Sequence, residues 1–570
     1  MLCEPVMANT DGLRNETAPL SGVRAVQIWP WLLAGFAAAA MVALAFPLRL
    51  PLGSFYWDLV VYLDAFQRIR TGQAPALDFF APVGPLGYYL GYAIQRVFPN
   101  AQPLLLTNWA LMPVLLPLVA AILSQRGASR HALALLLPFL IFVALPINLF
   151  GYYPSPGLDG YGIYNRHSAT LLYWLAATLI FVEGPRARTA LVAMLILALF
   201  LTKITGAVAG AMMVGYACLI GRMRLGEAIL AALGCVIALL VIDWPAGLVR
   251  AYLADVFTLI RMNTGTLLPR LLYVASGKFA VVVPAAVLVA LLCWIGWQER
   301  DGPPSVRLRR ILASSAGWLA VTLAASALFE TQNSGSLDFI ALWPALLLII
   351  LDWRSRSDAM RPVVLVLALA VALPSVLFAI ERGARALVGT IGDTAVLSAP
   401  ELGPLGRVNL KRSLAQRAET MVAFYGDHQD TYQALVAKGL EPSAILYGEI
   451  DYQATWLLEV RQGLVALRQW EQRERRRLNG VFTLDFVDPF NALLDRAGPL
   501  HVSIGAMPGR SVPPLDARTL ASLAETDAIL VPKCPPTPAR ADLAKHFQPA
   551  LAGRQAVALS PCWEMFVRPR

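Results

Sequence analysis

The sequence predicts a mainly α-helical polytopic membrane protein with a C-terminal extracytoplasmic α/β domain, and three observations support this fold class. First, its 570 residues are 57% hydrophobic and only 15% charged, with a mean hydropathy of +0.58, whereas soluble domains have about 25% charged residues. Second, apolar segments that approach the length needed to cross a bilayer, about 20 residues, recur through the first two thirds of the chain. Third, these segments stop beyond Glu381, where charge and proline increase.

The apolar segments define the predicted domains. Residues 1–27 lack a cleavage pattern ahead of a short hydrophobic region, so we expect a cytoplasmic tail followed by a retained helix. Residues 28–380 form the predicted transmembrane module, and residues 381–570 the extracytoplasmic domain. We expect about 11 transmembrane helices in the module. The predicted spans are 28–48, 103–124, 132–150, 168–183, 190–203, 206–221, 227–244, 280–297, 311–329, 339–352 and 362–380.

Arginine residues in alternate connections predict the orientation of the chain. Cytoplasmic loops of membrane proteins are enriched in Lys and Arg, and every second connection here is basic. The pattern places the N-terminus in the cytoplasm and the C-terminal domain on the opposite side of the membrane. The Ala, Leu and Arg usage fits a bacterium, so we expect the inner membrane, with the C-terminal domain in the periplasm. It also predicts a surface helix from Pro85 to Phe98, because another span there would invert the later loops. Most of the net charge of +10 lies in such loops, so we expect no nucleic-acid partner.

The first predicted outer loop, residues 49–102, carries three carboxylates in a chain that is poor in charge. They belong to Asp58, Asp64 and Asp78. If Asp58 begins a short helix, Tyr62 lies on the same face of that helix, whereas Asp64 turns away. Glycine and proline then end the helix. A carboxylate beside aromatic rings at the membrane surface is a candidate site for chemistry.

Two more outer positions carry charge. The loop 151–167 holds Asp159, Arg166 and His167 among four tyrosines. Tyrosine is ordinary at a membrane interface, but an aromatic belt does not need charges of both signs. Lys203 lies between two apolar runs, where it either serves a functional site or extends its amine to the interface.

The long outer loop 245–279 is basic, on the side where the orientation does not place positive charge. Arg261 and Arg270 are its candidates for binding a phosphate, because the guanidinium group offers a planar fork of donors. A later outer loop adds the carboxylates of Glu330 and Asp338.

Together these outer residues match the parts of a lipid-linked phosphosugar: an apolar tail, a phosphate and a sugar. A carboxylate would act either as general base on an acceptor hydroxyl or as ligand of a divalent cation, Mg²⁺ or Mn²⁺, and the sequence leaves both roles open. The candidates for contacts to sugar, acceptor or metal are Tyr62, Asp64, Asp78, Asp159, Arg166, His167, Glu330 and Asp338.

The first outer loop resembles that of the GT-C superfamily of integral-membrane glycosyltransferases, in the branch of protein O-mannosyltransferases and the aminoarabinose transferases of lipid A. The positions that match the pattern of this branch are Asp58, Tyr62, Asp64, Ala65, Gly72, Pro85, Leu86, Tyr89 and Leu90. A second motif, the Leu-Thr-Lys-Gly turn, is similar to Leu201-Thr202-Lys203. Leu59 stands where the branch often has Glu, and the Lys before the proline pair is absent.

The resemblance implies a GT-C-like catalytic module and an inverting transfer of a hexose or pentose from a polyprenyl-phosphate donor. The acceptor would be an envelope glycan, lipid or protein on the periplasmic side. The resemblance also implies that Asp58 is the catalytic carboxylate and that Lys203 lies near the donor phosphate. Two alternatives keep a lipid-linked saccharide as substrate: a transporter or flippase, and an oligosaccharide polymerase or ligase. A purely structural membrane protein would not need Asp58, Asp159 and Lys203 on one side.

Beyond Glu381 the pattern is that of a small α/β domain. A helical pattern from Gln453 to Leu478 precedes four short apolar runs, which predict strands. The runs are VFTLDFV, LHVSI, AILVPK and VALSPCWEMFV. Cys534 and Cys562 fall in this domain and either form a disulfide or stay unpaired and buried. The sequence contains no CxxC or HExxH motif, so it indicates no metal cage made of protein ligands.

Overall fold

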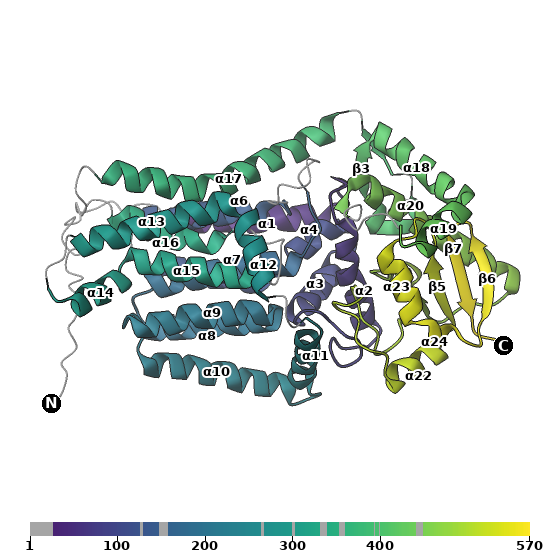
Figure 1. The fold of residues 1–570 in the computed structure, drawn as a ribbon, viewed down its shortest axis with the longest axis horizontal. Helices are drawn as coiled ribbons and strands as arrows, with labels where there is room; N and C mark the ends of the chain where they lie inside the picture. The colour runs from purple at the N-terminus through teal and green to yellow at the C-terminus, as the bar shows by residue number, and fades with distance from the viewer. Residues whose placement is uncertain are drawn as a thin grey trace.

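The computed structural model describes residues 27–125, 129–147, 158–263, 267–298, 302–330, 339–352, 360–392, 394–397, 399–440 and 448–569. A bundle of long, roughly parallel helices makes up one end of the molecule, and sheets with further helices make up the other (Figure 1). Except for Gln27, the predicted N-terminal tail lies outside the described residues.

Every predicted span coincides with one helix or with two consecutive helical segments. They are, in chain order, α1 (Trp29–Ala45), α4 (Pro103–Asn108) with α5 (Met112–Ser124), α6 (Ser129–Ala144), α7 (Ile163–Phe181), α8 (Pro185–Thr202), α9 (Ile204–Leu219), α10 (Leu225–Asp243), α13 (Phe279–Gln298), α15 (Ser315–Glu330), η3 (Ile340–Leu342) with α16 (Trp343–Leu351), and α17 (Arg361–Ile391).

Not all of these helices have the length of a full span. Four of them, α8, α10, α13 and α17, are long and apolar enough to cross a membrane, and α15 with the preceding α14 (Pro304–Leu312) makes a fifth candidate that is bent by 60°. On α10, the side chains of Leu230, Ile237 and Val241 are 63%, 61% and 66% exposed. Contact of such apolar surface with lipid is energetically favourable, whereas its contact with water is not. The chain is therefore a multi-pass membrane protein.

Helix α7 lies inside the bundle: every side chain from Asn165 to Phe181 is buried. Arginines from two predicted cytoplasmic connections cap its C-terminal end. Arg222 donates hydrogen bonds to the carbonyl oxygens of Leu179 and Ile180, and Arg188 donates to that of Val182. These bonds satisfy carbonyl groups that a helix C-terminus leaves open. They lie at the end of α7 opposite to its polar first turn.

The outer connections hold the short elements β1 (Leu50–Pro51), η2 (Tyr56–Asp58), α2 (Leu59–Arg70), α3 (Leu86–Val97), α11 (Leu248–Met262) and α12 (Leu267–Gly277). Of these, α2, α3 and α11 lie between the bundle and the C-terminal part (Figure 1). The helix predicted from Pro85 to Phe98 is α3. The predicted loop 245–279 contains the two helices α11 and α12. Helix α2 ends before Gly72, whose φ of +91° suits glycine.

Helix α17 continues past residue 381, the predicted domain boundary, without a break. The elements beyond it are β2 (Thr394–Val396), η5 (Pro400–Gly406), β3 (Val408–Lys411), α18 (Arg412–Asp427), α19 (Gln429–Ala437), α20 (Ile450–Glu474), β4 (Val481–Thr483), α21 (Phe490–Leu494), α22 (Ala517–Glu525), β5 (Ala528–Pro532), α23 (Pro538–His546), α24 (Gln548–Leu551), β6 (Gln555–Ser560) and β7 (Trp563–Val567). The predicted helix from Gln453 corresponds to α20.

The strands beyond α17 belong to two β-sheets. The four-stranded sheet has the order β4-β5-β7-β6, with β4 parallel to β5 and the other neighbours antiparallel. The smaller sheet, β1-β3-β2, pairs Leu50 of the first outer loop with Val408 in parallel. The prediction of a strand at LHVSI is wrong. The backbone there forms hydrogen bonds with the first outer loop, and Ser503 forms only an isolated bridge with Phe80.

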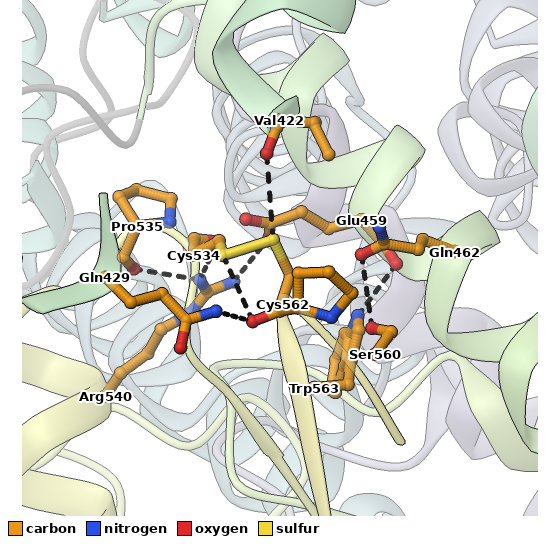
Figure 2. The surroundings of a disulfide bond; sticks show 11 residues. Val422, Gln429, Glu459, Gln462, Cys534, Pro535, Arg540, Ser560, Cys562 and Trp563 are labelled. Carbon is orange, nitrogen blue, oxygen red and sulfur yellow. Dashed lines mark hydrogen bonds and ion pairs between the residues drawn. A yellow bond between two sulfur atoms is a disulfide. The ribbon is translucent and has the colours of Figure 1, made fainter. Parts of the chain in front are cut away.

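A disulfide joins Cys534, after β5, to Cys562, before β7, with a Cα–Cα distance of 5.0 Å (Figure 2). The sequence had left this pairing open. Both residues are buried. Beside the bond, Arg540 donates to the Cys534 carbonyl at 2.6 Å and forms ion pairs with Glu459 and Asp485. The disulfide and this ion-pair cluster together connect α20, α23 and the sheet.

Candidate active site

Asp58 lies at the end of η2, directly before the first residue of α2. The preceding Phe55 has a left-handed backbone, with φ of 49°, which turns the chain sharply into the helix. The carboxylate accepts a hydrogen bond from the Gly162 backbone N–H at 3.3 Å. Asp58 therefore lies where the first outer loop meets the segment that leads into α7.

The surroundings of Asp58 favour its neutral form. Burial raises the pKa of its carboxyl to about 8, and the nearby Asp159 adds to the rise. The Gly162 N–H and the positive charge of Arg510 act in the opposite direction and lower this pKa. A carboxylate whose pKa is close to neutral is suited to accept and release a proton in catalysis.

Three glycines bring the outer segments into backbone contact. A Cβ atom on Gly53 would lie 2.1 Å from the Leu158 carbonyl oxygen, and one on Gly84 would lie 2.1 Å from that of Leu201. A Cβ on Gly160 would lie 2.4 Å from the Phe55 carbonyl oxygen. No side chain fits at these distances. The glycines thus fix Asp58, the segment after Leu158 and the turn after Leu201 in one place.

Asp159 and Arg166, two of the predicted site residues, form a buried ion pair with an N–O distance of 3.3 Å. Asp159 also accepts a hydrogen bond from the Tyr161 N–H at 2.7 Å. Burial raises the pKa of Asp159 to about 6, against the lowering effects of Arg166 and the Tyr161 N–H. Both carboxylate oxygens of Asp159 already have partners, so its first role is to hold the segment beside Asp58.

Lys203 is the single residue between α8 and α9, and its backbone is extended, with φ of −163°. Its Nζ donates to the Asn165 side-chain oxygen at 3.1 Å and lies 4.8 Å from the centre of the Tyr164 ring. Tyr164 in turn interacts electrostatically with Asp58. The first turn of α7 therefore connects Lys203 with Asp58.

The predicted phosphate ligands of loop 245–279 lie in two different helices. Arg261 is exposed in the last turn of α11, and Arg270 is half-buried in α12. Arg270 donates to the Asn263 side-chain oxygen at 3.3 Å. On the same helix as Arg261, Asp255 accepts from the Ala81 N–H at 3.2 Å, which connects α11 to the first outer loop.

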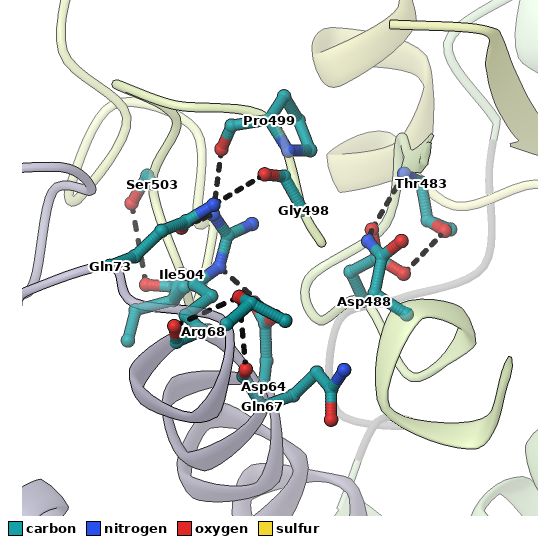
Figure 3. Close-up of polar contacts among 12 residues, drawn as sticks. Asp64, Gln67, Arg68, Gln73, Thr483, Asp488, Gly498, Pro499, Ser503 and Ile504 are labelled. Carbon is teal, nitrogen blue, oxygen red and sulfur yellow. Dashed lines mark hydrogen bonds and ion pairs between the residues drawn. The ribbon is translucent and has the colours of Figure 1, made fainter. Parts of the chain in front are cut away.

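Asp64 and Asp78 are placed in the contacts that hold the first outer loop, away from the direct environment of Asp58. Asp64 forms a buried ion pair with Arg68 at 3.0 Å. Arg68 also donates to the Pro499 carbonyl at 2.7 Å and to the Gln73 side chain at 3.0 Å (Figure 3). The Asp78 carboxylate accepts from the Ala74 N–H at 2.7 Å and closes a turn.

The remaining predicted site residues surround this centre at different distances. Tyr62 packs on Tyr88 with ring centres 5.3 Å apart, and it interacts electrostatically with Asp58. His167 Nε2 lies 3.0 Å from the Asn108 carbonyl oxygen. Glu330 is buried at the end of α15 and interacts electrostatically with Lys203. Asp338 lies outside the described residues.

The residues around Asp58 do not fit a protein-held metal ion. Asp159, the neighbouring carboxylate, is already bound to Arg166 and to a backbone N–H. Among the described residues, the group of three metal-ligand types that lie close enough is Glu459, Cys534 and Cys562, and the two thiols of that group form the disulfide. Proton transfer and phosphate binding at this site therefore fall to the side chains of the protein.

Several residues near Asp58, Lys203 and Arg270 were not predicted from the sequence. Asn165 and Asn263 orient Lys203 and Arg270, but asparagine in a helix turn gives no signal of its own. Arg510 lies more than 400 residues from Asp58 in the chain, yet its charge acts on that carboxyl. The glycine spacing in Gly-Tyr-Gly at 160–162 was the available signal for a close backbone approach.

No protein-family model matches the chain, and no curated protein matches it. Two solved structures do. One is the crystal structure of ArnT from Cupriavidus metallidurans in the apo state, with 15% identity, 95% of this chain and 99% of that chain covered, and a TM-score of 0.38. The other is the same protein bound to undecaprenyl phosphate, with 14% identity, 96% and 100% coverage, and a TM-score of 0.40. The match runs along nearly the whole chain, but at these scores the chemistry rests on the residues described above.

Proposed function

We propose that this protein is a membrane glycosyltransferase that moves a sugar from a polyprenyl-phosphate donor to a hydroxyl group of an envelope glycan, lipid or protein. One observation carries the proposal. A half-buried carboxylate with a pKa of about 8, Asp58, lies in one region with the basic residues Lys203, Arg270 and Arg510, at one end of an apolar helical bundle. A lipid-linked sugar phosphate needs a base, positive charge and an apolar surface in this arrangement.

In the proposed reaction, the prenyl tail lies against the apolar surface of the bundle, and the phosphate lies near Lys203 and Arg270. The Asp58 carboxylate takes the proton of the acceptor hydroxyl. The acceptor oxygen then forms a bond to the anomeric carbon from the face opposite the phosphate, while the bond from that carbon to the phosphate oxygen breaks. Polyprenyl phosphate leaves with the electron pair, and the configuration at the anomeric carbon inverts.

The cations would act mainly on the leaving group. A phosphate that gains negative charge as the glycosidic bond breaks is stabilised by Lys and Arg in a site with little water. Asn165 holds the Lys203 amine and Asn263 holds the Arg270 guanidinium, so both are already oriented before substrate binds. We further propose that the site faces the periplasm, as the basic connections at the opposite end of the bundle predict.

The test compares cells that lack the protein with cells that carry the wild type, Asp58→Asn or the control Asp542→Asn. Asp542 is an exposed acid of α23 and lies outside the site. We expect a polyprenyl-phosphate sugar to accumulate in the deletion and in Asp58→Asn, while one envelope glycan, lipid or protein loses that sugar. Asp542→Asn should behave as wild type. If Asp58→Asn restores the sugar and the deletion does not, the protein acts as a transporter or flippase of the lipid-linked saccharide instead.

A further inference from the structure

The C-terminal part reaches the candidate site through residues 505–511, here called the Arg510 loop. The chain just before this loop is bound to the first outer loop by backbone hydrogen bonds. The His501 N–H donates to the Asp78 carbonyl at 2.6 Å, the Phe80 N–H to the Val502 carbonyl at 2.9 Å, and the Ile504 N–H to the Phe80 carbonyl at 3.1 Å. The Arg510 loop therefore starts from a fixed position beside the loop that carries Asp58.

The loop is closed by one serine. The Ser511 hydroxyl donates to the Gly505 carbonyl at 2.6 Å and accepts from the Met507 N–H at 3.0 Å. Gly505 has φ of +68° and Gly509 has φ of +69°, so each turns the chain where other residues would be strained. Gly505 also packs against Val61 of α2, one turn after Asp58. These contacts present Arg510 at the tip of a closed loop.

On its other side, the loop contacts the basic residues of the α11–α12 region. The Asn263 side chain donates to the Arg510 carbonyl at 3.1 Å and accepts from Arg270 at 3.3 Å. Burial and the positive charge of Arg510 both lower the pKa of Arg270, and Arg510 also interacts electrostatically with Lys203. Two basic side chains from separate segments, Lys203 and Arg270, thus lie within electrostatic range of Arg510.

This gathering of like charge costs free energy unless an anion shares it. Within the described part of the chain, no carboxylate forms an ion pair with Arg510, whose exposed side chain contacts the Met507 sulfur with 4.0 Å between Nη1 and Sδ. By contrast, other arginines at the ends of the outer elements have acidic partners: Arg68 pairs with Asp64 and Arg496 with Glu471. The guanidinium of Arg510 is therefore available to a ligand.

We propose that Arg510 of the C-terminal part binds the phosphate group of the lipid-linked substrate together with Lys203 and Arg270. This inference rests on the proposed function and extends it. The C-terminal part would then be a direct component of the donor site. Because Arg510 also acts on Asp58, it would link phosphate binding to the proton affinity of the base.

The first experiment measures binding of a short polyprenyl phosphate, and of the matching polyprenol without phosphate, to the purified full-length protein. The variants are Arg510→Ala, Arg510→Lys and the control Arg518→Ala, an exposed arginine of α22 in the same part of the chain. We expect Arg510→Ala to weaken binding of the phosphate lipid about 10- to 100-fold, the range for a lost charged hydrogen bond. Arg510→Lys should recover part of the affinity, and polyprenol binding should not change.

The outcomes separate the two proposals. If the wild type does not prefer the phosphate lipid over polyprenol, the proposed function itself fails. If the wild type has this preference and Arg510→Ala keeps it at full strength, the function stands and the role of Arg510 is refuted. Equal weakening of phosphate lipid and polyprenol would mean that Arg510 only supports the fold, which also refutes the proposal.

A second readout depends on charge and not on shape. Because Arg510 lowers the pKa of Asp58, Arg510→Ala should move the rising limb of the pH–rate profile to higher pH, and Arg510→Lys should leave it near its original position. The groups that act on this carboxyl are Asp159, Arg510 and the Gly162 N–H, and only one of them changes in these variants. An unchanged profile in Arg510→Ala would contradict the proposed link to the base.

Discussion

Gly84 lies in backbone contact with Leu201, so that a Cβ atom on Gly84 would come within 2.1 Å of the Leu201 carbonyl oxygen. The Gly84 N–H also donates to the carbonyl of Thr202 at 3.0 Å. This contact joins the first outer loop to the turn that carries Lys203. The distance between the proposed base and one proposed phosphate ligand is therefore set by a residue without a side chain.

Gly84→Ala should separate these two segments and lower transfer activity strongly. The obstacle is backbone on the α8 side, which cannot rotate away, so we also expect a loss of stability of about 1–3 kcal/mol, typical of overpacking. Thermal unfolding and donor turnover of the purified protein measure both effects. Gly35→Ala is the control, since nothing lies within 4 Å of a Cβ at Gly35. Wild-type turnover in Gly84→Ala would show that the contact does not set the site.

The pH dependence of transfer should follow the Asp58 carboxyl. Its pKa is about 8, and a general base works in its deprotonated form. The rate at limiting substrate should therefore rise with pH up to about 8, fall about tenfold per unit below that value, and level off above it. A profile that is flat from pH 6 to pH 9 would exclude Asp58 as the base. The residual rate of Asp58→Asn should lack this dependence.

Two arginines of α2 should differ sharply in their effect on stability. Arg68 is fully buried between Asp64 and the Pro499 carbonyl, so Arg68→Met leaves the Asp64 carboxylate buried without its partner. Breaking such a pair costs about 3–5 kcal/mol. Arg70 pairs with Asp495 at the surface, and Arg70→Ala should cost less than about 1 kcal/mol. Denaturant or thermal unfolding of the full-length protein measures both, and similar losses would contradict this account of Arg68.

The disulfide should stabilise the C-terminal part under oxidising conditions. Cys534 and Cys562 are 28 residues apart in sequence, and a bond that closes a loop of this length contributes about 3–4 kcal/mol in the chain-entropy model. The double variant Cys534→Ser/Cys562→Ser should thus unfold at lower temperature and become more sensitive to protease near β7. Cys293→Ser, which removes a free cysteine of α13, is the control. No change on reduction would refute a stabilising role.

Sequence reasoning recovered the long helices of the bundle because each is an apolar run of nearly membrane length. The α3 surface helix followed from charge alternation between loops, and the short helix predicted to begin at Asp58 corresponds to α2. The run LHVSI was misassigned since its alternation suits a strand, whereas its actual partner, Phe80, lies in a loop more than 400 residues earlier. A local pattern carries no information on such a distant partner.

The same limit applies to the candidate site. Asp58, Asp159 and Lys203 stand out because charge is rare next to apolar spans. Asp64 stood out for the same reason, yet its carboxylate forms an ion pair with Arg68, four residues further along the helix. Arg510 did not stand out at all, because the C-terminal part is rich in arginine. Only the three-dimensional arrangement places Arg510 within electrostatic range of Asp58, Lys203 and Arg270.

Two contacts of the first outer loop have a consequence for biogenesis. Leu50 pairs with Val408 in a sheet, and Arg68 donates to the carbonyl of Pro499, which lies 431 residues later in the chain. The loop that carries Asp58 leaves the ribosome about 400 residues before the segments that hold it. In the proposed orientation, the nascent protein inserts its bundle with this loop unsupported and without Arg510. The enzyme would thus remain inactive during its own synthesis, and a truncated product would occupy the membrane without consuming donor lipid.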